Sequence, residues 1–190
     1  MNKILYAFAL AGVLGLSSCS DFLDQTSPSE MTAENTYASP YYTNLRVNKL
    51  YGGMGQDRTY AQDLSIVWNL NSDCELIDGL GSNATNTSSE RGNMNYNMDP
   101  GWSKISGVWD AEYGIIEDAN QIIEGIRSSA TFTAGGANQK SMERSLGEAL
   151  TIRAMVYFDL VRIFGDIPFK REASKSDLSN AYLEKTDRDI

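Results

Sequence analysis

Two long apolar stripes in the second half of the chain constrain its fold more than any other feature. Between residues 103 and 128, apolar side chains recur three, four or seven positions apart, at Ile105, Val108, Trp109, Ile116, Ala119, Ile123 and Ile126. A second stripe over residues 139–164 contains Met142, Leu146, Ala149, Val156, Leu160 and Phe164. This spacing places the apolar residues on one face of an α-helix. The sequence therefore predicts two long amphipathic helices, the second ended by Gly165 and kept from resuming by Pro168.

The connection between these helices is short. Residues 131–138 contain Gly135 and Gly136 and read as a connector. Two long helices joined in this way are expected to pack antiparallel, as in a tetratricopeptide-like hairpin. The predicted fold class is therefore all-α, built from tetratricopeptide-like helical hairpins.

An earlier helix is predicted over residues 40–51. Ser39 and Pro40 form a helix start, with a capping hydroxyl followed by proline at the first helical position. Gly52 and Gly53 are expected to stop this helix. The glycines at 52, 53 and 55 do not match a nucleotide-binding fingerprint, and a helix C-cap is the better account of them.

Composition excludes several classes of function. The chain has 190 residues, a formal net charge of −9 and no histidine. An acidic protein is a poor binder of nucleic acid. Without an imidazole, the usual catalytic triads and most zinc or iron sites are excluded. No nucleic-acid partner and no cofactor or metal is therefore expected.

The amino terminus has the pattern of a bacterial lipoprotein leader. Lys3 precedes an uncharged run from Ile4 to Leu16, which is too short for a stable membrane anchor and typical of a signal-peptide core. The following Leu16-Ser17-Ser18-Cys19 resembles a lipobox, in which the cysteine is lipidated and becomes the first residue. The alternative is that Cys19 is an ordinary residue of a cleaved leader. We expect a signal peptide over 1–18 and stable membrane attachment through acyl chains.

The next segment is polar and reads as a tether. Residues 19–39 are rich in Ser, Thr, Asn and Asp, and we expect them to lead from the membrane to a helical domain over 40–190. If Cys19 carries lipid, Cys74 has no cysteine left with which to form an intramolecular disulfide. Cys74 is expected to be a small buried apolar residue, with a reactive thiol as the alternative.

A long polar segment over residues 71–101 differs in composition from the rest of the chain. It is rich in Asn, Ser, Thr, Asp and Gly, and it carries Tyr96, with Trp102 at its far end. A polar loop of this length is usually functional or disordered. Exposed aromatic rings would stack on the C–H face of a sugar, while Asp, Asn and Arg would bond its hydroxyls. The alternative is that Tyr96 and Trp102 only pin the loop to the core.

The second long helix also carries a family resemblance. The run from Gly147 to Pro168, GEALTIRAMVYFDLVRIFGDIP, resembles the signature helix of the SusD/RagB family. Trp109, Tyr113, Ile116 and Ala119-Asn120 are similar to the preceding family helix, and the lipobox followed by Ser20-Asp21-Phe22-Leu23-Asp24 resembles the family's start. The resemblance implies a surface-exposed outer-membrane lipoprotein. Such a protein binds a glycan and serves as a lid on a TonB-dependent transporter, importing oligosaccharides without catalysis.

The resemblance also implies that more chain exists in the family. Its members are considerably longer than this chain, with further helical hairpins and much of the binding surface beyond residue 190. We therefore expect the sequence to be an amino-terminal fragment or a truncated product.

Candidate ligand-binding residues follow from the resemblance and from residue type. The family's binding loop corresponds to the polar segment, and Asp73 matches a position where family members often place an acid near sugar hydroxyls. A cap of a helix or turn is the alternative role for Asp73. Arg91, Asn93, Tyr96 and Trp102 match by residue type and neighbourhood. Charged groups make the stronger hydrogen bonds to such a ligand.

The charged residues of the signature helix are expected to be structural. Glu148, Arg153, Asp159 and Arg162 are spaced for ion pairs and contacts between helices. Three classes of function stay open on the sequence. They are a glycan-binding uptake lipoprotein, a structural helical-repeat lid or adaptor of the transporter without its own sugar site, and a carboxylate-based glycosidase. No spacing singles out a catalytic carboxylate pair, so the first two classes are favoured.

Overall fold

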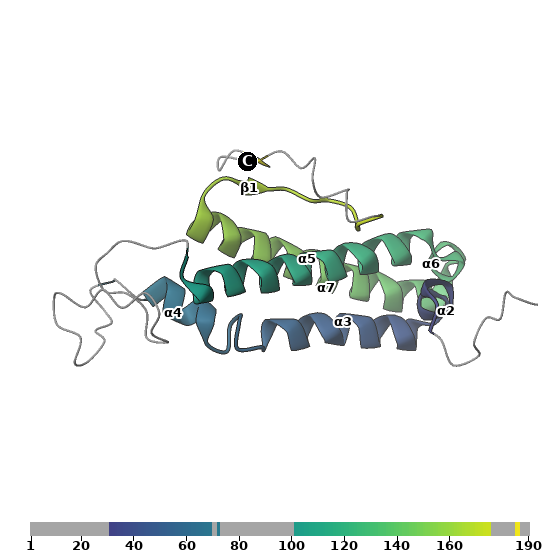
Figure 1. Cartoon of the computed structure of the whole chain (residues 1–190). Coiled ribbons are helices and arrows are strands. Elements are labelled where there is room, and N and C mark those ends of the chain that lie inside the picture. Colours follow the sequence, from purple (N-terminus) through teal and green to yellow (C-terminus); the bar gives the residue numbers. More distant parts are fainter. Residues whose placement is uncertain (1–30, 70–71, 73–100, 176–184, 187–190) are drawn as a thin grey trace, which may run out of the picture. The chain divides into compact units, whose positions relative to one another are not determined.

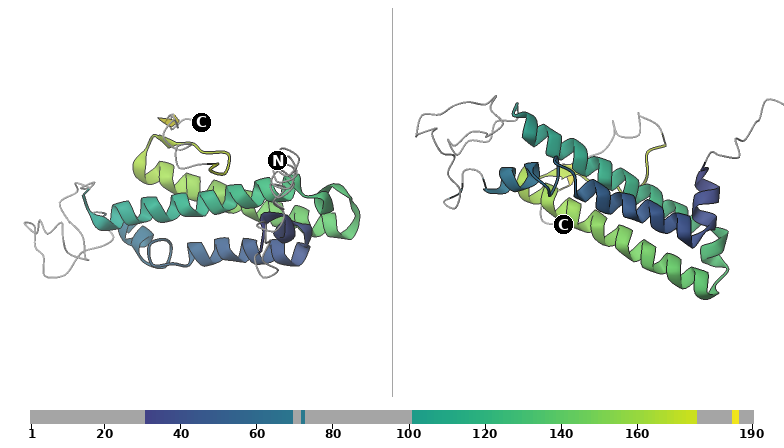
Figure 2. Two further views of the ribbon diagram at one scale, coloured as in Figure 1. Left: turned by 45° about the vertical axis from the view of Figure 1, so that its right-hand side comes forward. Right: turned by 90° about the horizontal axis from the view of Figure 1, so that it is seen from below.

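A computed structural model of the chain describes residues 31–69, 72, 101–175 and 185–186. Three helices form its body: α3 (Pro40–Met54), α5 (Ser103–Ser128) and α7 (Gly136–Phe164). Each of them packs against the other two. α5 runs antiparallel to both α3 and α7, so that α3 lies along the hairpin made by α5 and α7 (Figure 1). The view from below shows the three helices side by side (Figure 2). The predicted all-α hairpin architecture is confirmed.

Three short helices complete the described helical body. α2 (Ala33–Ala38) and α6 (Ala130–Thr133) lie at one end of the bundle, and α4 (Asp63–Asn69) lies at the other (Figure 1). The sequence predicts none of the three, because each is too short to show an apolar period. α2 falls inside the range 19–39 expected to be a tether. Helical structure in the described residues therefore begins at Ala33, within the range expected to be the tether.

The helix boundaries follow local chemistry. α5 spans the predicted range 103–128, and α7 ends at Phe164 as predicted, with Gly165 at φ 75° accepting a backbone conformation that favours glycine. α7 begins at Gly136, three residues before the predicted start. Gly135 and Gly136 both have φ 82°, so the reversal of the chain is completed within these two residues.

α3 continues past the glycines that are predicted to stop it. It reaches Met54, and the N–H of Gly55 then donates to the carbonyl of Tyr51. Gly53 allows close packing here, since a Cβ would lie 3.1 Å from the Ile115 side chain of α5. The buried Thr59 hydroxyl lies 2.8 Å from the carbonyl oxygen of Gly53 and 2.6 Å from that of Met54. Thr59 of the following turn thus caps carbonyl groups at the end of α3. Pro40 is the first residue of the helix.

The main hydrophobic core lies between α3, α5 and α7. It includes the large buried residues Val47, Leu50, Ile116, Ile122, Ile126, Met142, Val156 and Leu160. A second, smaller cluster, which we call the α4–α5 cluster, consists of Leu64, Val67, Trp102, Ile105 and Val108. This cluster joins α4 to the start of α5 at one end of the bundle.

An extended segment over residues 165–175, called the strap here, covers the α5–α7 hairpin on the side away from α3 (Figure 1). Its backbone carbonyls accept hydrogen bonds from the helices, as in the bond from the Tyr113 hydroxyl to Pro168 at 2.7 Å. Asn120 donates to the carbonyls of Lys170 and Glu172. Within the strap, strand β1 (Ile167–Pro168) pairs antiparallel with β2 (Lys185–Thr186).

Candidate functional site

The two ends of the polar segment are attached to the same part of the bundle. α4 ends at Asn69, just before the segment, and α5 begins at Ser103, just after it. Trp102, the residue before α5, is only 4% exposed and packs in the α4–α5 cluster with residues from both helices. Of the two roles considered for Trp102, its burial favours pinning the segment to the core over stacking on a ligand.

A buried ion pair reinforces this attachment. The Lys104 ammonium lies 2.7 Å from an Asp63 carboxylate oxygen, and each side chain is only 12% exposed. Asp63 begins α4 and Lys104 belongs to the first turn of α5. A pair shielded in this way is screened less by salt than an exposed one. The pair therefore fixes the two flanking helices to one another.

The other residues predicted to bind ligand lie outside the described residues. These are Asp73, Arg91, Asn93 and Tyr96, and the same holds for the lipidation residue Cys19 and for Cys74. Their assignment stays a prediction from the sequence.

The structure brings Glu112 of α5 near Asp159 of α7, and sequence reasoning missed Glu112. Glu112 of α5 is fully buried, and both of its carboxylate oxygens lack a hydrogen-bond partner among the described residues. Burial, followed by the nearby charge of Asp159, raises the pKa of Glu112 to about 8. The Tyr60 hydroxyl donates to Asp159, whose pKa is also raised, mainly by burial. At neutral pH Glu112 therefore holds its proton.

The sequence did contain a signal for Glu112. It stands at helical spacing between Val108 and Ile116, so that it occupies the apolar stripe of α5 rather than the polar face. An acid on the buried stripe is seldom fully buried without a partner. Such a position marks a group with a shifted pKa.

The charged residues of α7 make the structural contacts that their spacing predicts. Glu148 pairs with Arg144 one turn earlier and accepts a hydrogen bond from the Tyr51 hydroxyl of α3. Arg153 donates to the Asn120 side chain of α5 at 2.6 Å. Arg162 contacts α4 by stacking over the ring of Trp68.

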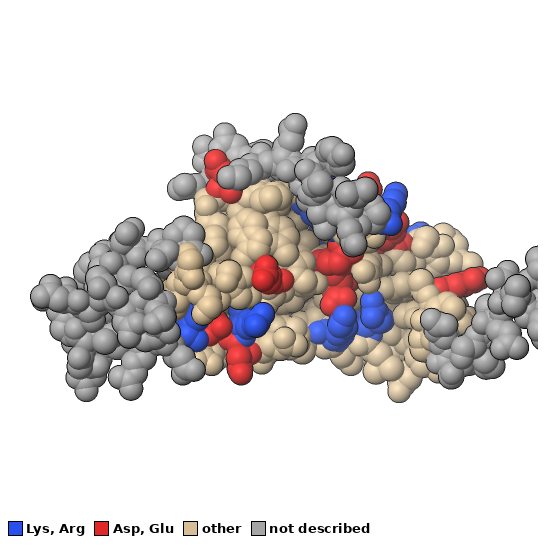
Figure 3. Space-filling view, in the orientation of Figure 1, with Lys and Arg blue, Asp and Glu red and all other residues tan. Residues whose placement is uncertain are grey.

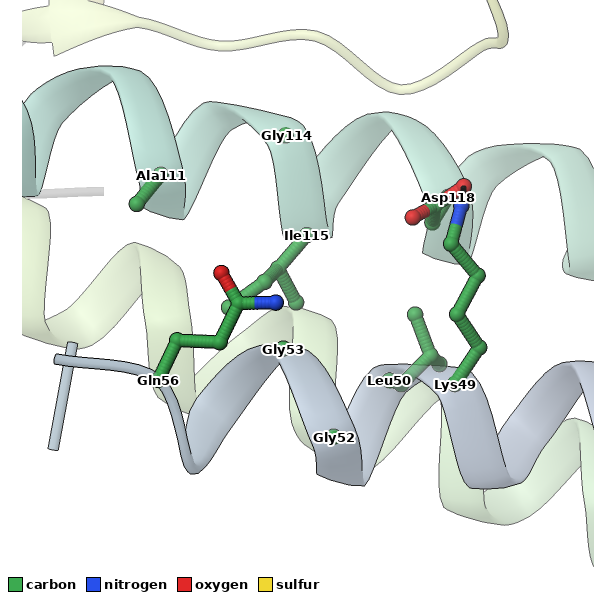
Figure 4. A pocket seen from close by; sticks show the side chains of 9 residues that line it. All are labelled: Lys49, Leu50, Gly52, Gly53, Gln56, Ala111, Gly114, Ile115 and Asp118. Atoms are coloured by element: carbon green, nitrogen blue, oxygen red, sulfur yellow. Dashed lines mark hydrogen bonds and ion pairs between the residues drawn. The ribbon is translucent and has the colours of Figure 1, made fainter. Parts of the chain in front are cut away.

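A shallow groove runs between α3 and α5 (Figure 4). It has a volume of about 420 Å³ and is lined by Lys49, Leu50, Gly52, Gly53, Gln56, Ala111, Gly114, Ile115 and Asp118. Its walls are low because four of these residues are glycine or alanine. Lys49 and Asp118 close one end with an ion pair of 2.7 Å. The two charges on its rim neutralise each other, so they offer little net charge to a ligand.

Charges of both signs are interspersed on this face of the molecule (Figure 3). Arg46 and Lys49 of α3 both approach Asp118 of α5. The face therefore lacks the contiguous basic patch that is typical of a nucleic-acid-binding surface. In the ranges 31–69 and 101–175, no group of three or more metal-ligating side chains is placed to hold an ion. Over the same ranges, no helix combines the length and apolar character needed to cross a membrane.

Known proteins resemble the chain in sequence and in fold. A family model of SusD-like proteins, described as starch-binding and associating with the outer membrane, matches residues 21–188. SusD-like protein P25 of Formosa agariphila is 23% identical over 180 residues, and SusD-like protein P2 of the same organism is 27% identical over 172 residues. These alignments cover 90% and 89% of this chain and 31% of each relative. The chain thus spans about a third of the length of these relatives.

The same fold occurs in a solved structure. The crystal structure of a SusD homologue from Bacteroides thetaiotaomicron superposes with a TM-score of 0.67 and 22% sequence identity. The superposition covers 83% of this chain and 28% of the homologue. The family model matches most of the chain, and the helices it matches have the expected arrangement. The chain therefore belongs to the SusD/RagB family.

Proposed function

We propose that the chain is a non-catalytic, cell-surface glycan-binding lipoprotein that acts with a TonB-dependent outer-membrane transporter in oligosaccharide uptake. Family membership supports the ligand class and the association with the outer membrane. The observation that carries the proposal is the attachment of the polar segment. The helices on either side of the segment, α4 and α5, meet in the α4–α5 cluster and are tied by the Lys104–Asp63 pair. A binding segment placed on a rigid base loses less entropy when it binds.

The proposed ligand contacts come from the segment itself. Tyr96 would supply a stacking ring, while Asp73, Arg91 and Asn93 would bond the sugar hydroxyls. The burial of Trp102 gives this residue the supporting role of holding the segment's end in place.

The buried acids Glu112 and Asp159 do not form a glycosidase site. A glycosidase needs two carboxyl groups on either side of the scissile bond, and both must reach the substrate. Glu112 and Asp159 are the neighbouring acids with raised pKa values in the described ranges, and Glu112 is fully buried. This pair is therefore not placed to act on a glycan.

Anchoring and partnership complete the proposal. The leader pattern supports lipid attachment at Cys19, which would hold the protein at the outer membrane. A lid on a transporter needs such an anchor, since the anchor raises the effective concentration of the two partners.

Calorimetric titration of the full chain with a panel of oligosaccharides tests the proposal. We expect heat with at least one glycan and a loss of affinity of about 1 to 3 kcal/mol for Tyr96→Ala, by analogy with ring stacking on bases. Tyr41→Ala is the matched control, because this ring is 68% exposed at the start of α3, at the end of the bundle opposite α4 (Figure 1). Equal affinity of the Tyr96 variant and the parent would refute the assignment of Tyr96. Absence of heat with every glycan would refute the proposed function.

A structural adaptor is the second candidate function. It is favoured by the exposed apolar side chains Tyr41, Tyr42 and Leu45 on α3. The adaptor function predicts that the chain co-purifies with the transporter and that Leu45→Asp abolishes this co-purification. If, in addition, no glycan gives heat on titration, the glycan-binding function is excluded.

A further inference from the structure

Arg162 on α7 contacts two aromatic rings. Its guanidinium carbon lies 5.1 Å from the centre of the Trp68 ring and 5.3 Å from the centre of the Phe158 ring. Arg162 is exposed, and it makes no hydrogen bond or ion pair with a residue in the part of the chain that the structure describes. Its N–H donors therefore have no partner among the described residues, while two aromatic rings contact the guanidinium.

The inner end of this stack is anchored to the core. The Trp68 ring packs edge-on against Tyr60, at 6.3 Å between ring centres. The Tyr60 hydroxyl in turn donates to Asp159, one helical turn before Arg162 on α7. Asp159 is almost completely buried and accepts this bond, and the nearby charge of Arg162 partly offsets the burial that raises the pKa of Asp159. The position of Arg162 is thus set before any ligand arrives.

The outer end of the stack is open. Phe158 is 62% exposed, and its neighbour on the same helical face, Met155, is 45% exposed. An open phenyl face offers van der Waals contact to the flat C–H face of a pyranose. Beside it, the guanidinium supplies only donors and no acceptor, in a planar fork that matches a carboxylate. A ligand that uses both groups has a sugar ring and a carboxylate.

We propose that Phe158 and Arg162 form a subsite for a uronic acid residue of a glycan. The sugar ring stacks on Phe158, and its carboxylate accepts two N–H bonds from Arg162. This inference rests on the proposed glycan-binding function and names the charge class of the ligand. Both residues belong to α7, a helix of 29 residues.

The acidic character of the chain makes the subsite selective. With a formal net charge of −9, the protein does not attract polyanions over a distance. A uronate must therefore be recognised through ring stacking and the paired hydrogen bonds together. A polyanion without sugar rings, such as polyglutamate, is expected to leave the subsite empty.

Calorimetric titration of the full chain with trigalacturonate tests the proposal, with the methyl-esterified trisaccharide as a ligand that lacks the charge. We expect Phe158→Ala and Arg162→Gln each to weaken trigalacturonate binding about tenfold. Arg162→Lys keeps the charge but loses the fork, and should fall between parent and Arg162→Gln. Esterification should weaken binding to the parent by a similar factor and have no further effect on Arg162→Gln.

Controls separate this proposal from misfolding and from the wider function. Tyr41→Ala, an exposed ring on α3, should bind trigalacturonate as the parent does. Thermal midpoints of the Phe158 and Arg162 variants within about 2 °C of the parent show that lost binding is not lost folding. Binding of neutral glycans but not of trigalacturonate would overturn the subsite and leave the proposed function standing. Equal binding of the acid and its ester, or an unchanged Arg162→Gln, would also overturn it.

Discussion

Replacing Gly125 of α5 by alanine should destabilise the protein, because the ring of Tyr37 occupies the space that a side chain would need. A Cβ at Gly125 would lie 2.1, 2.3 and 2.5 Å from three atoms of that ring. Ordinary contact begins near 3.4 Å, so the ring must move by about 1 Å or leave its place. Tyr37 is buried, and the Ser129 hydroxyl donates to its carbonyl at 2.5 Å, so α2 is held at this point.

The magnitude follows from two opposing effects. Loss of a buried aromatic costs about 3 to 5 kcal/mol, and replacing glycine by alanine within a helix returns about 1 kcal/mol. We expect Gly125→Ala to lower the free energy of unfolding by about 2 to 4 kcal/mol. For a chain of this size the thermal midpoint should fall by roughly 10 °C.

Chemical denaturation of matched variants measures the effect. Gly114→Ala is the control, since it lies in the same helix and a Cβ there meets nothing within 4 Å. That variant should be slightly more stable than the parent. In a Tyr37→Ala background, Gly125→Ala should cost nothing, because the clash is gone. A Gly125→Ala protein as stable as Gly114→Ala would refute the reasoning.

Three further predictions concern the acid, the tryptophan and the anchor. Because the pKa of Glu112 is raised from 4.5 to about 8, the folded state keeps a proton that the unfolded state releases, and stability falls as pH rises through this window. The loss of stability reaches at most about 5 kcal/mol. Glu112→Gln should abolish this part of the pH dependence. An equal free energy of unfolding of the parent at pH 5 and pH 9 would contradict the prediction. Trp102→Ala should lower the free energy of unfolding by about 3 to 5 kcal/mol. An unchanged denaturation midpoint would instead favour ligand stacking as the role of Trp102. Cys19→Ala should stop incorporation of a clickable palmitate in cells, whereas equal labelling of mutant and parent would exclude lipidation at this residue.

The sequence predicts the parts of the fold that depend on repeated spacing. The limits of α5 are predictable because apolar residues recur at helical spacing from Ile105 to Ile126, although Glu112 and Asn120 also lie on the buried face. α4 and α6 have no such stripe. α4 is held by its contacts in the α4–α5 cluster, and α6 is capped by the hydroxyl of Ser129. The path of the strap cannot be predicted from local sequence either, because the side chains that bind it belong to α5 and α7.

The candidate site, like the fold, is only partly predictable from the sequence. Phe158 lies off the buried stripe of α7, so its exposure is readable from spacing, but its stacking with Arg162 depends on the tertiary position of Trp68. The burial of Trp102 depends on α4, which the pattern does not reveal. Asp73, Arg91, Asn93 and Tyr96 stay predictions from residue type and family resemblance.

The strap has a consequence for which substitutions the family can accumulate. Helix side chains recognise it largely through its main chain, since Asn120, Arg153 and Tyr157 bond to carbonyls of the strap residues. A carbonyl is present whatever the side chain, so positions such as Arg171 and Glu172 can drift freely during evolution. Their partners on the helices have no such freedom, because a shorter or apolar side chain leaves buried carbonyls without donors. Sequence divergence in the strap should therefore concentrate at exposed positions such as Arg171 and Glu172. The buried Ile167, the Lys170 that pairs with Glu117, and the helix residues that bind the carbonyls should change slowly.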